Sequence, residues 1–342
     1  MMTTNPSQQK PHGETPSYVK AQAVDAALIP VIDLSGRDDP KTRARLAKEL
    51  VAIAENSGFF YVSQHGIAKE LCTAAFEASR RFFALDAEVK SKITVDQHQR
   101  GWMAQGLTNL EGSATHDAKE VFFWGYDIAP DDADLKAGAP LVALNQWPAE
   151  DAPFLKENIL PYYHAVLDLG RDILSLLAEG LGQSPDFFAK AYEKPLGRGQ
   201  LVYYPAMDGD DHKAERFGAA AHSDFGVLTI LMQDDLGGLQ IKSANGGWIE
   251  APPIHDTFVC NIGDLLEMWT NNRLTSTLHR VINTSPKSRF SIPVFCDPAS
   301  MTVINPRDFD PKAGGGASSG ETTTAGAYIS GKNRKNFAHY KK

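Results

Sequence analysis

The chain has 342 residues, of which 42% are hydrophobic and 22% charged, and 34 basic against 42 acidic residues give a formal net charge of −8. This composition excludes a wholly disordered chain, because the apolar content suffices for a sizeable core. The deficit of positive charge argues against a protein that binds nucleic acid or anionic membrane surfaces. A small molecule is therefore the expected partner, and the length allows either two domains or one large barrel with added helices.

The N-terminal leader, residues 1–28, is expected to be flexible. It is polar and has neither the apolar run of a secretion signal nor an Arg-rich amphipathic pattern. No stretch approaches the roughly 18 uninterrupted apolar residues of a membrane-spanning helix. The three cysteines, Cys72, Cys260 and Cys296, lie far apart and form no CxxC pair, as expected in a reducing compartment. These observations predict a cytoplasmic protein; its oligomeric state is open, with a monomer favoured.

Residues 29–150 are predicted to form a mixed α and β region. Short apolar runs at 29–34 and 59–62 are typical of strands. Between and after them, residues 41–57 and 67–83 place apolar side chains at helical spacing. The front third of the chain is therefore expected to alternate strands and helices.

Residues 151–311 are predicted to hold a long helix followed by a β-rich core. One apolar stripe runs along residues 160–181, and Gly182 is the expected end of that helix. Short apolar runs separated by turn residues then favour an antiparallel sandwich or barrel. These runs are 201–204, 227–232, 238–241, 257–262, 278–282 and 290–295. The last part, 312–342, is expected to be a mobile Gly-, Ser- and Thr-rich loop over 312–325 and a C-terminal tail.

The first candidate site combines His222 and Asp224. Side chains two positions apart on a strand point to the same face, so both residues can reach one metal ion. Such pairs also arise by chance, as the His-x-Glu triplet at His12 shows, and a structural histidine is the alternative. His279 lies in a second strand-like run 55 residues after Asp224. Two imidazoles and one carboxylate are the ligand set of non-haem Fe(II) oxygenases, which leaves open positions on the metal.

A second candidate site combines Arg289 and Ser291, again two positions apart in an expected strand. A guanidinium fork together with a hydroxyl group suits a carboxylate ligand. The alternative is a solvated arginine at the rim of a sheet. The wider context of the chain decides between the two interpretations.

That context is a series of short motifs between about residue 29 and residue 300. Together and in this order they resemble the isopenicillin N synthase-like branch of the Fe(II)- and 2-oxoglutarate-dependent oxygenases. The motifs are IPVID at 29–33, GFFYV at 58–62, KE at 119–120, YYP at 203–205, HSD at 222–224, GGLQ at 237–240, NIGD at 261–264, STLHRV at 276–281 and RFS at 289–291.

The resemblance implies a mainly β fold with flanking helices, in which a double-stranded β-helix, or jelly-roll barrel, forms the core. It implies that His222, Asp224 and His279 bind Fe(II) and act in catalysis. It also implies that Arg289 and Ser291 bind the distal carboxylate of 2-oxoglutarate.

Tyr204 is expected as a further contact to that cosubstrate. The implied activity is a dioxygenase that hydroxylates or desaturates a small organic molecule with release of succinate and CO2. Its cofactors would be Fe(II), 2-oxoglutarate and O2, with ascorbate as an optional reductant. Two alternatives remain: an oxidase of the isopenicillin N synthase or ethylene-forming type that does not consume 2-oxoglutarate, and a non-catalytic binding or sensing protein.

The substrate is expected to meet aromatic residues at the barrel mouth. Similar proteins line this mouth with the segment that here contains Trp102, Phe122 and Trp124, although aromatic side chains are more often simply packed in the core. The tail over 328–340 is a candidate lid, because the Gly-rich stretch before it would allow it to close.

Overall fold

The computed structural model describes residue 21 and residues 29–107, 117–207, 217–283, 285–313 and 322–336. The expected flexible leader lies outside the described residues except for its residue 21. The described helices are α1 (Pro40–Asn56), α2 (Lys69–Phe83), α3 (Ala87–Ser91), α4 (Ala133–Lys136), α5 (Phe154–Gly180), α7 (Asp264–Trp269) and α8 (Ala325–Asn336), with 3-10 turns η1 (Ala189–Tyr192) and η2 (Pro306–Asp308).

The strands fill most of the second half of the chain, as the short apolar runs predict. They are β1 (Val31–Asp33), β2 (Phe59–Ser63), β3 (Gly101–Met103), β4 (Glu120–Trp124), β5 (Arg198–Tyr204), β6 (Ala219–His222), β7 (Leu228–Gln233), β8 (Leu239–Lys242), β9 (Trp248–Glu250), β10 (Phe258–Ile262), β11 (His279–Val281), β12 (Arg289–Cys296), β13 (Val303–Ile304) and β14 (Thr323–Thr324).

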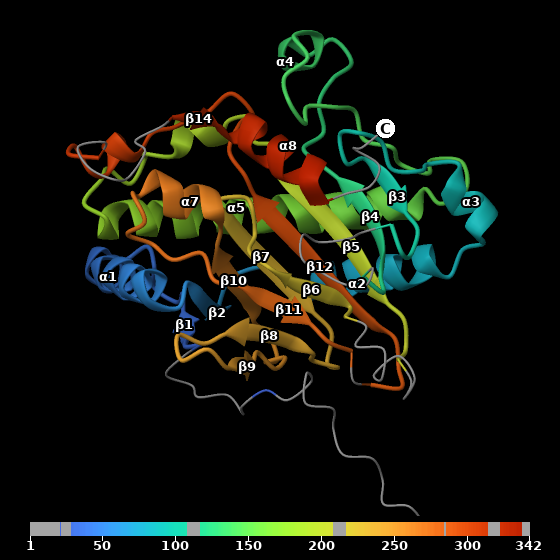
Figure 1. The fold of residues 1–342 in the computed structure, drawn as a ribbon, viewed down its shortest axis with the longest axis horizontal. Helices are drawn as coiled ribbons and strands as arrows, with labels where there is room; N and C mark the ends of the chain where they lie inside the picture. The colour runs from blue at the N-terminus through green and yellow to red at the C-terminus, as the bar shows by residue number, and fades with distance from the viewer. Residues whose placement is uncertain are drawn as a thin grey trace, which may run out of the picture.

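These strands form two main sheets. The larger has the order β1-β2-β10-β7-β12-β5-β4-β3, and the smaller has the order β6-β11-β8-β9. From β5 to β12 the chain crosses repeatedly between them, and only β8 and β9 are consecutive strands of one sheet. This alternation between two facing antiparallel sheets is a jelly roll, which confirms the predicted fold class (Figure 1).

Helices cover the outer face of the larger sheet. The long helix α5 packs against β7 and β12 and is flanked by α1 and α2 (Figure 1). The backbone of α5 lies so close to the sheet that a Cβ atom on Gly170 would come within 2.5 Å of Cys296 Sγ. Gly182, at φ +85°, follows the end of α5 as predicted, a conformation that glycine adopts without strain.

Two apolar clusters therefore lie on opposite faces of the larger sheet. One joins α1, α2 and α5 to the outward side chains of the strands, and the other fills the barrel between the two sheets. Among the described residues, no helix is both long and apolar enough to cross a membrane.

The end of the chain differs in part from the prediction of a mobile loop and tail. Of the expected mobile loop over 312–325, residues 314–321 lie outside the described residues. Its last part is ordered, because Thr323–Thr324 form β14 and pair with β13. The tail then continues as α8, whose Ala325 and Ile329 are fully buried.

Candidate metal centre and active site

Two histidines meet across neighbouring strands of the smaller sheet. His222 is the last residue of β6 and His279 the first of β11, and the antiparallel register places them directly opposite each other. Their ring centroids are 4.4 Å apart. Phe59 of β2 packs edge-on against His279 at 5.4 Å, which holds that ring from the facing sheet.

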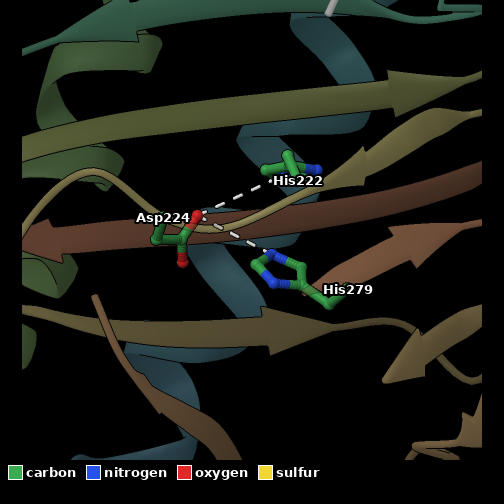
Figure 2. Close-up of side chains that lie close together, drawn as sticks. All are labelled: His222, Asp224 and His279. Atoms are coloured by element: carbon green, nitrogen blue, oxygen red, sulfur yellow. Dashed lines mark ion pairs between the residues drawn. The ribbon is translucent and has the colours of Figure 1, made fainter. Parts of the chain in front are cut away.

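Asp224 follows β6 and turns its carboxylate toward both rings (Figure 2). Its Oδ1 atom lies 3.9 Å from His222 Nε2 and 3.7 Å from His279 Nε2. The three residues offer ligand atoms within 4.8 Å of one another, a cluster that could hold a metal ion. The structure thus brings together the three residues that the sequence selects.

Backbone carbonyls orient both imidazoles. His222 Nδ1 lies 2.7 Å from the carbonyl oxygen of Ala220, and His279 Nδ1 lies 3.3 Å from that of Thr277. Because a carbonyl only accepts, each Nδ1 carries a proton, and in the neutral imidazole this leaves the lone pair on Nε2. Both lone pairs are therefore available on the side of the ring that faces Asp224.

The protonation states also suit a cation. Burial and the neighbouring His279 lower the pKa of His222 to about 4, so its imidazole is neutral at physiological pH. Burial alone would raise the pKa of Asp224, but the two histidines and two hydrogen bonds lower it overall, so the carboxylate is charged. Two imidazole nitrogens and one anionic oxygen therefore converge on one point, a ligand set that suits a divalent metal.

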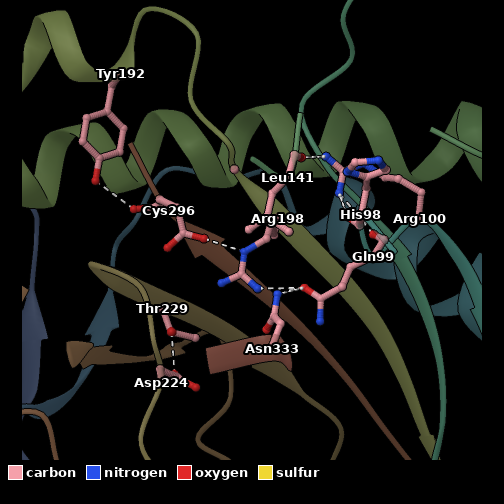
Figure 3. A network of polar contacts seen from close by, with 12 residues as sticks. His98, Gln99, Arg100, Leu141, Tyr192, Arg198, Asp224, Thr229, Cys296 and Asn333 are labelled. Atoms are coloured by element: carbon pink, nitrogen blue, oxygen red, sulfur yellow. Dashed lines mark hydrogen bonds and ion pairs between the residues drawn. The ribbon is translucent and has the colours of Figure 1, made fainter. Parts of the chain in front are cut away.

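Two polar side chains fix the carboxylate. Thr229 Oγ1 donates to Asp224 Oδ2 at 2.5 Å, and Asn261 Nδ2 donates to the same oxygen at 2.7 Å (Figure 3 shows the first bond). Oδ1 is left to face the imidazoles. The sequence analysis assigned neither donor to the metal site, although Asn261 is the first residue of the NIGD motif at 261–264. No such motif contains Thr229.

A second polar centre lies at Arg289, on the barrel side of β12. Its side chain is 1% exposed, and it donates from Nε to the carbonyl oxygen of Gly237 at 2.6 Å and from Nη2 to Gln233 Oε1 at 3.2 Å. Nη1 is buried and has no acceptor among the described residues. A buried cation with an unused donor is costly by itself and suits an anionic ligand.

Ser291 and Tyr204 lie beside Arg289, as the sequence predicts. Ser291 is buried two positions further along the same strand, and Tyr204 pairs with Arg289 across β5 and β12. The guanidinium carbon lies 4.9 Å from the centroid of the Tyr204 ring. The three side chains therefore share one region of the barrel.

The structure does not bring the predicted aromatic substrate contacts to the metal centre. Phe122 and Trp124 point to the helix-covered face, where Trp124 packs at 5.9 Å against Tyr163 of α5. Trp102 donates its indole N–H to Glu120 Oε2 at 3.0 Å. These three side chains pack in the cluster between the larger sheet and the helices instead of facing the metal centre. Side chains alternate along a strand, and these three lie on its outer face.

The opposite face of the same strands lines a cavity of about 70 Å3 beside His222 and Asp224. Met103, Val121 and Phe123 contribute from β3 and β4. A larger groove of about 670 Å3 lies elsewhere, near the start of α2, and includes none of the three clustered ligands. The smaller cavity is the candidate active site, because two of the three clustered ligands, His222 and Asp224, line it.

Comparison with known proteins agrees with this geometry. Residues 199–298 match the family model of the 2OG-Fe(II) oxygenase superfamily, and residues 29–150 match the model described as the N-terminal part of the non-haem dioxygenase in morphine synthesis. A probable iron/ascorbate oxidoreductase of Dictyostelium discoideum is 36% identical, over 82% of this chain and 84% of that protein. The chain belongs to the 2OG-Fe(II) oxygenase superfamily.

Other members of the superfamily show the same length and fold. A homoarginine-6-hydroxylase of Glycine max is 33% identical, with 92% of this chain and 99% of that protein covered. The crystal structure of a full-length Neurospora crassa protein in complex with alpha-KG superposes with a TM-score of 0.76 at 28% identity, over 89% of this chain and 95% of that one. This superfamily member is an Fe(II)- and 2-oxoglutarate-dependent dioxygenase that uses O2, as the motifs predict.

Proposed function

We propose that His222, Asp224 and His279 hold Fe(II) and that the cosubstrate and O2 bind beside them. The convergence of two imidazole Nε2 atoms and one carboxylate oxygen carries this assignment. Bound Fe(II) and 2-oxoglutarate would supply, with O2, the chemistry that oxidises a substrate C–H bond and releases succinate and CO2. The protein positions these groups and excludes water from them.

Arg289, Ser291 and Tyr204 are assigned to the distal carboxylate of 2-oxoglutarate. The free Nη1 of Arg289 supports this role, because a carboxylate would complete its hydrogen bonds and neutralise its buried charge. Gly237 and Gln233 hold the guanidinium from the other side, so its plane is fixed before the cosubstrate arrives.

The proposed reaction is the hydroxylation or desaturation of a small organic molecule. The confined cavity beside the metal ligands supports a small substrate. The formal charge of −8 argues against a nucleic-acid partner, and three free cysteines suit the cytoplasm. The proposed working form is a monomer.

The assignment of Arg289 is tested with Arg289→Lys, which keeps the charge but removes the guanidinium fork. The 2-oxoglutarate affinity of the Fe(II)-loaded protein, measured by anaerobic calorimetry, is expected to fall roughly tenfold to a hundredfold. Arg273→Lys is the matched control, since Arg273 is half-exposed and contacts only Glu55 among the described residues. Unchanged affinity in Arg289→Lys would refute the assignment. Failure of the wild type to bind 2-oxoglutarate would favour the oxidase alternative.

A further inference from the structure

The cavity beside the metal ligands has a second polar wall, opposite the part formed by His222 and Asp224. Gln99 lies just before β3, Arg198 begins β5 and Asn333 lies on α8. All three side chains line the cavity and are nearly fully buried. Segments from distant parts of the sequence thus converge on one point near the metal centre.

Hydrogen bonds fix the orientation of the Gln99 amide. Arg198 Nη1 and Asn333 Nδ2 both donate to Gln99 Oε1, each at 3.1 Å. A guanidinium group can only donate, so the oxygen of Gln99 must face Arg198 and the nitrogen must face away. In Figure 3 the amide nitrogen of Gln99 points away from Arg198.

The Gln99 nitrogen is a buried hydrogen-bond donor on this wall. Gln99 is 2% exposed, and its Nε2 has no acceptor among the described residues. Its backbone adopts φ +56°, a left-handed conformation that costs energy for a residue with a side chain. The fold therefore holds a buried N–H donor against the cavity instead of burying it in a hydrogen bond.

The charges along this wall are already neutralised. Arg198 Nε contacts Asp297 Oδ2 at 2.8 Å, and Lys119 Nζ contacts Asp117 Oδ2 at 3.0 Å. Burial alone would lower the pKa of Lys119, but the Asp117 carboxylate and other nearby groups raise it overall, so the Lys119 ammonium stays charged. Among the described residues that line the cavity, Arg198 and Lys119 are each paired with a carboxylate. No charge on these two residues is left for a charged substrate, which disfavours such a substrate.

Flat apolar surfaces flank the free donor. The guanidinium carbon of Arg198 lies 4.9 Å from the centroid of the Phe295 ring. Phe295 and Phe123 both line the cavity, from β12 and β4. Aromatic walls favour a planar ligand, because ring faces give a large contact area with little loss of side-chain freedom.

We infer that Gln99 is a specificity-determining residue whose Nε2 donates to a carbonyl oxygen of the substrate, and that the substrate is a compact, neutral ring with an amide-type carbonyl. Arg198 and Asn333 are positioning residues that act through Gln99. This inference rests on the proposed function, because it places the carbonyl compound beside the metal centre.

The test compares three six-membered aromatic rings by anaerobic calorimetry on protein loaded with Fe(II) and 2-oxoglutarate. The first probe is 2-pyridone, which is a neutral lactam. The other two are benzoate, which is an anion, and benzylamine, which is a cation. We expect the wild type to bind 2-pyridone at least about tenfold more tightly than either charged ring, the effect of one well-placed hydrogen bond.

The decisive variant is Gln99→Glu. The carboxylate keeps an oxygen for Arg198 and Asn333, but its second oxygen replaces Nε2 and repels a carbonyl. We expect about tenfold weaker binding of 2-pyridone and a gain for benzylamine. Gln183→Glu makes the same change at a site whose amide, within the described part of the chain, donates to the carbonyl of Asp308, and it should leave all three affinities unchanged.

Gln99→Leu provides a second variant that removes the donor without adding a charge, and it too should lose 2-pyridone binding. Equal affinity of the wild type for the three rings, undetectable 2-pyridone binding at millimolar concentration, or full 2-pyridone affinity in a folded Gln99 variant would each overturn the inference. The preceding 2-oxoglutarate titration separates the two proposals. If 2-oxoglutarate binds normally and the ring preference is absent, only the role of Gln99 fails.

Discussion

Thr229 and Asn261 lie directly opposite each other on β7 and β10, and both donate to the same oxygen of Asp224. One pair of strands in the larger sheet thus fixes a carboxylate whose partner histidines belong to the smaller sheet. Metal ligands supported in this way keep their orientation before the metal arrives.

Replacement of Asn261 should therefore weaken metal binding without unfolding the protein. In Asn261→Leu, Asp224 retains only the bond from Thr229, and we expect Fe(II) affinity to fall about tenfold to a hundredfold. Anaerobic metal titration measures the change. Asn158→Leu, which among the described residues removes a bond to the carbonyl of Phe154 on α5, serves as the control. Equal Fe(II) affinity in both variants would argue against the role of Asn261.

Neighbouring residues of β4 should respond differently to substitution. Phe122 is fully buried against Phe82 at 5.1 Å, so Phe122→Ala should lower the free energy of unfolding by about 3–5 kcal/mol, as measured by urea denaturation. Phe123→Leu should instead raise succinate release in the absence of substrate, because a smaller side chain admits water beside the metal. The opposite result, in which Phe122→Ala raises succinate release per folded molecule and Phe123→Leu does not, would contradict the assignment of Phe122 to the helix-covered face and Phe123 to the cavity.

The cysteines should react slowly in the native protein. All three are free, Cys260 and Cys296 are buried, and burial raises the pKa of Cys72 to about 11. Because the thiolate is the nucleophile, labelling of Cys72 by a disulfide dye should accelerate about tenfold per pH unit between pH 7 and 9. Denatured protein should label at all three positions. Rapid stoichiometric labelling of native protein at pH 7 would contradict the burial of Cys72.

The C-terminal helix should limit uncoupled turnover. On α8, Lys332 and Tyr328 contact Asp264 Oδ2 at 3.0 and 3.2 Å, and Asn333 reaches the cavity. Deletion of residues 326–342 should increase 2-oxoglutarate consumption without substrate, since water then reaches the metal centre. The control is the double variant Arg334→Ala and Lys335→Ala, which changes only exposed positions of α8. A truncated, folded protein with normal coupling would show that α8 is no lid.

The grouping of His222, Asp224 and His279 could be predicted because each part depends on a local rule. The spacing of His222 and Asp224 predicts that both face one metal ion, although β6 ends at His222 and Asp224 reaches the site from the segment that follows the strand. The surrounding motifs identify the strand that carries His279. Helices α1, α2 and α5 were likewise visible, because one face of each is polar and the other is apolar.

The orientation of β4 could not be predicted in the same way. This strand is covered on both faces, by helices outside and by the barrel interior inside, so apolar residues occur at successive positions. Periodicity then gives no sign of which face looks inward. The sequence therefore could not show that Phe122 and Trp124 face the helices while Phe123 faces the barrel.

Contacts between distant polar residues were also beyond sequence reasoning. The bond between Gln99 and Asn333 joins residues 234 positions apart, and Asn261 lies 37 positions from Asp224. Glutamine and asparagine are common surface residues, so neither is distinguishable as a site residue until the fold brings it to the cavity.

The pairing of His222 with His279 across β6 and β11 has a consequence for recognising distant relatives. Hydrogen bonds between two neighbouring strands, not the length of the intervening chain, set the separation of these ligands. Turns between β7 and β10 can therefore gain or lose residues without moving either imidazole. A pattern search for such proteins should fix the His-x-Asp triplet and the Arg-x-Ser pair, and leave the gap between the first motif and the second histidine free to vary.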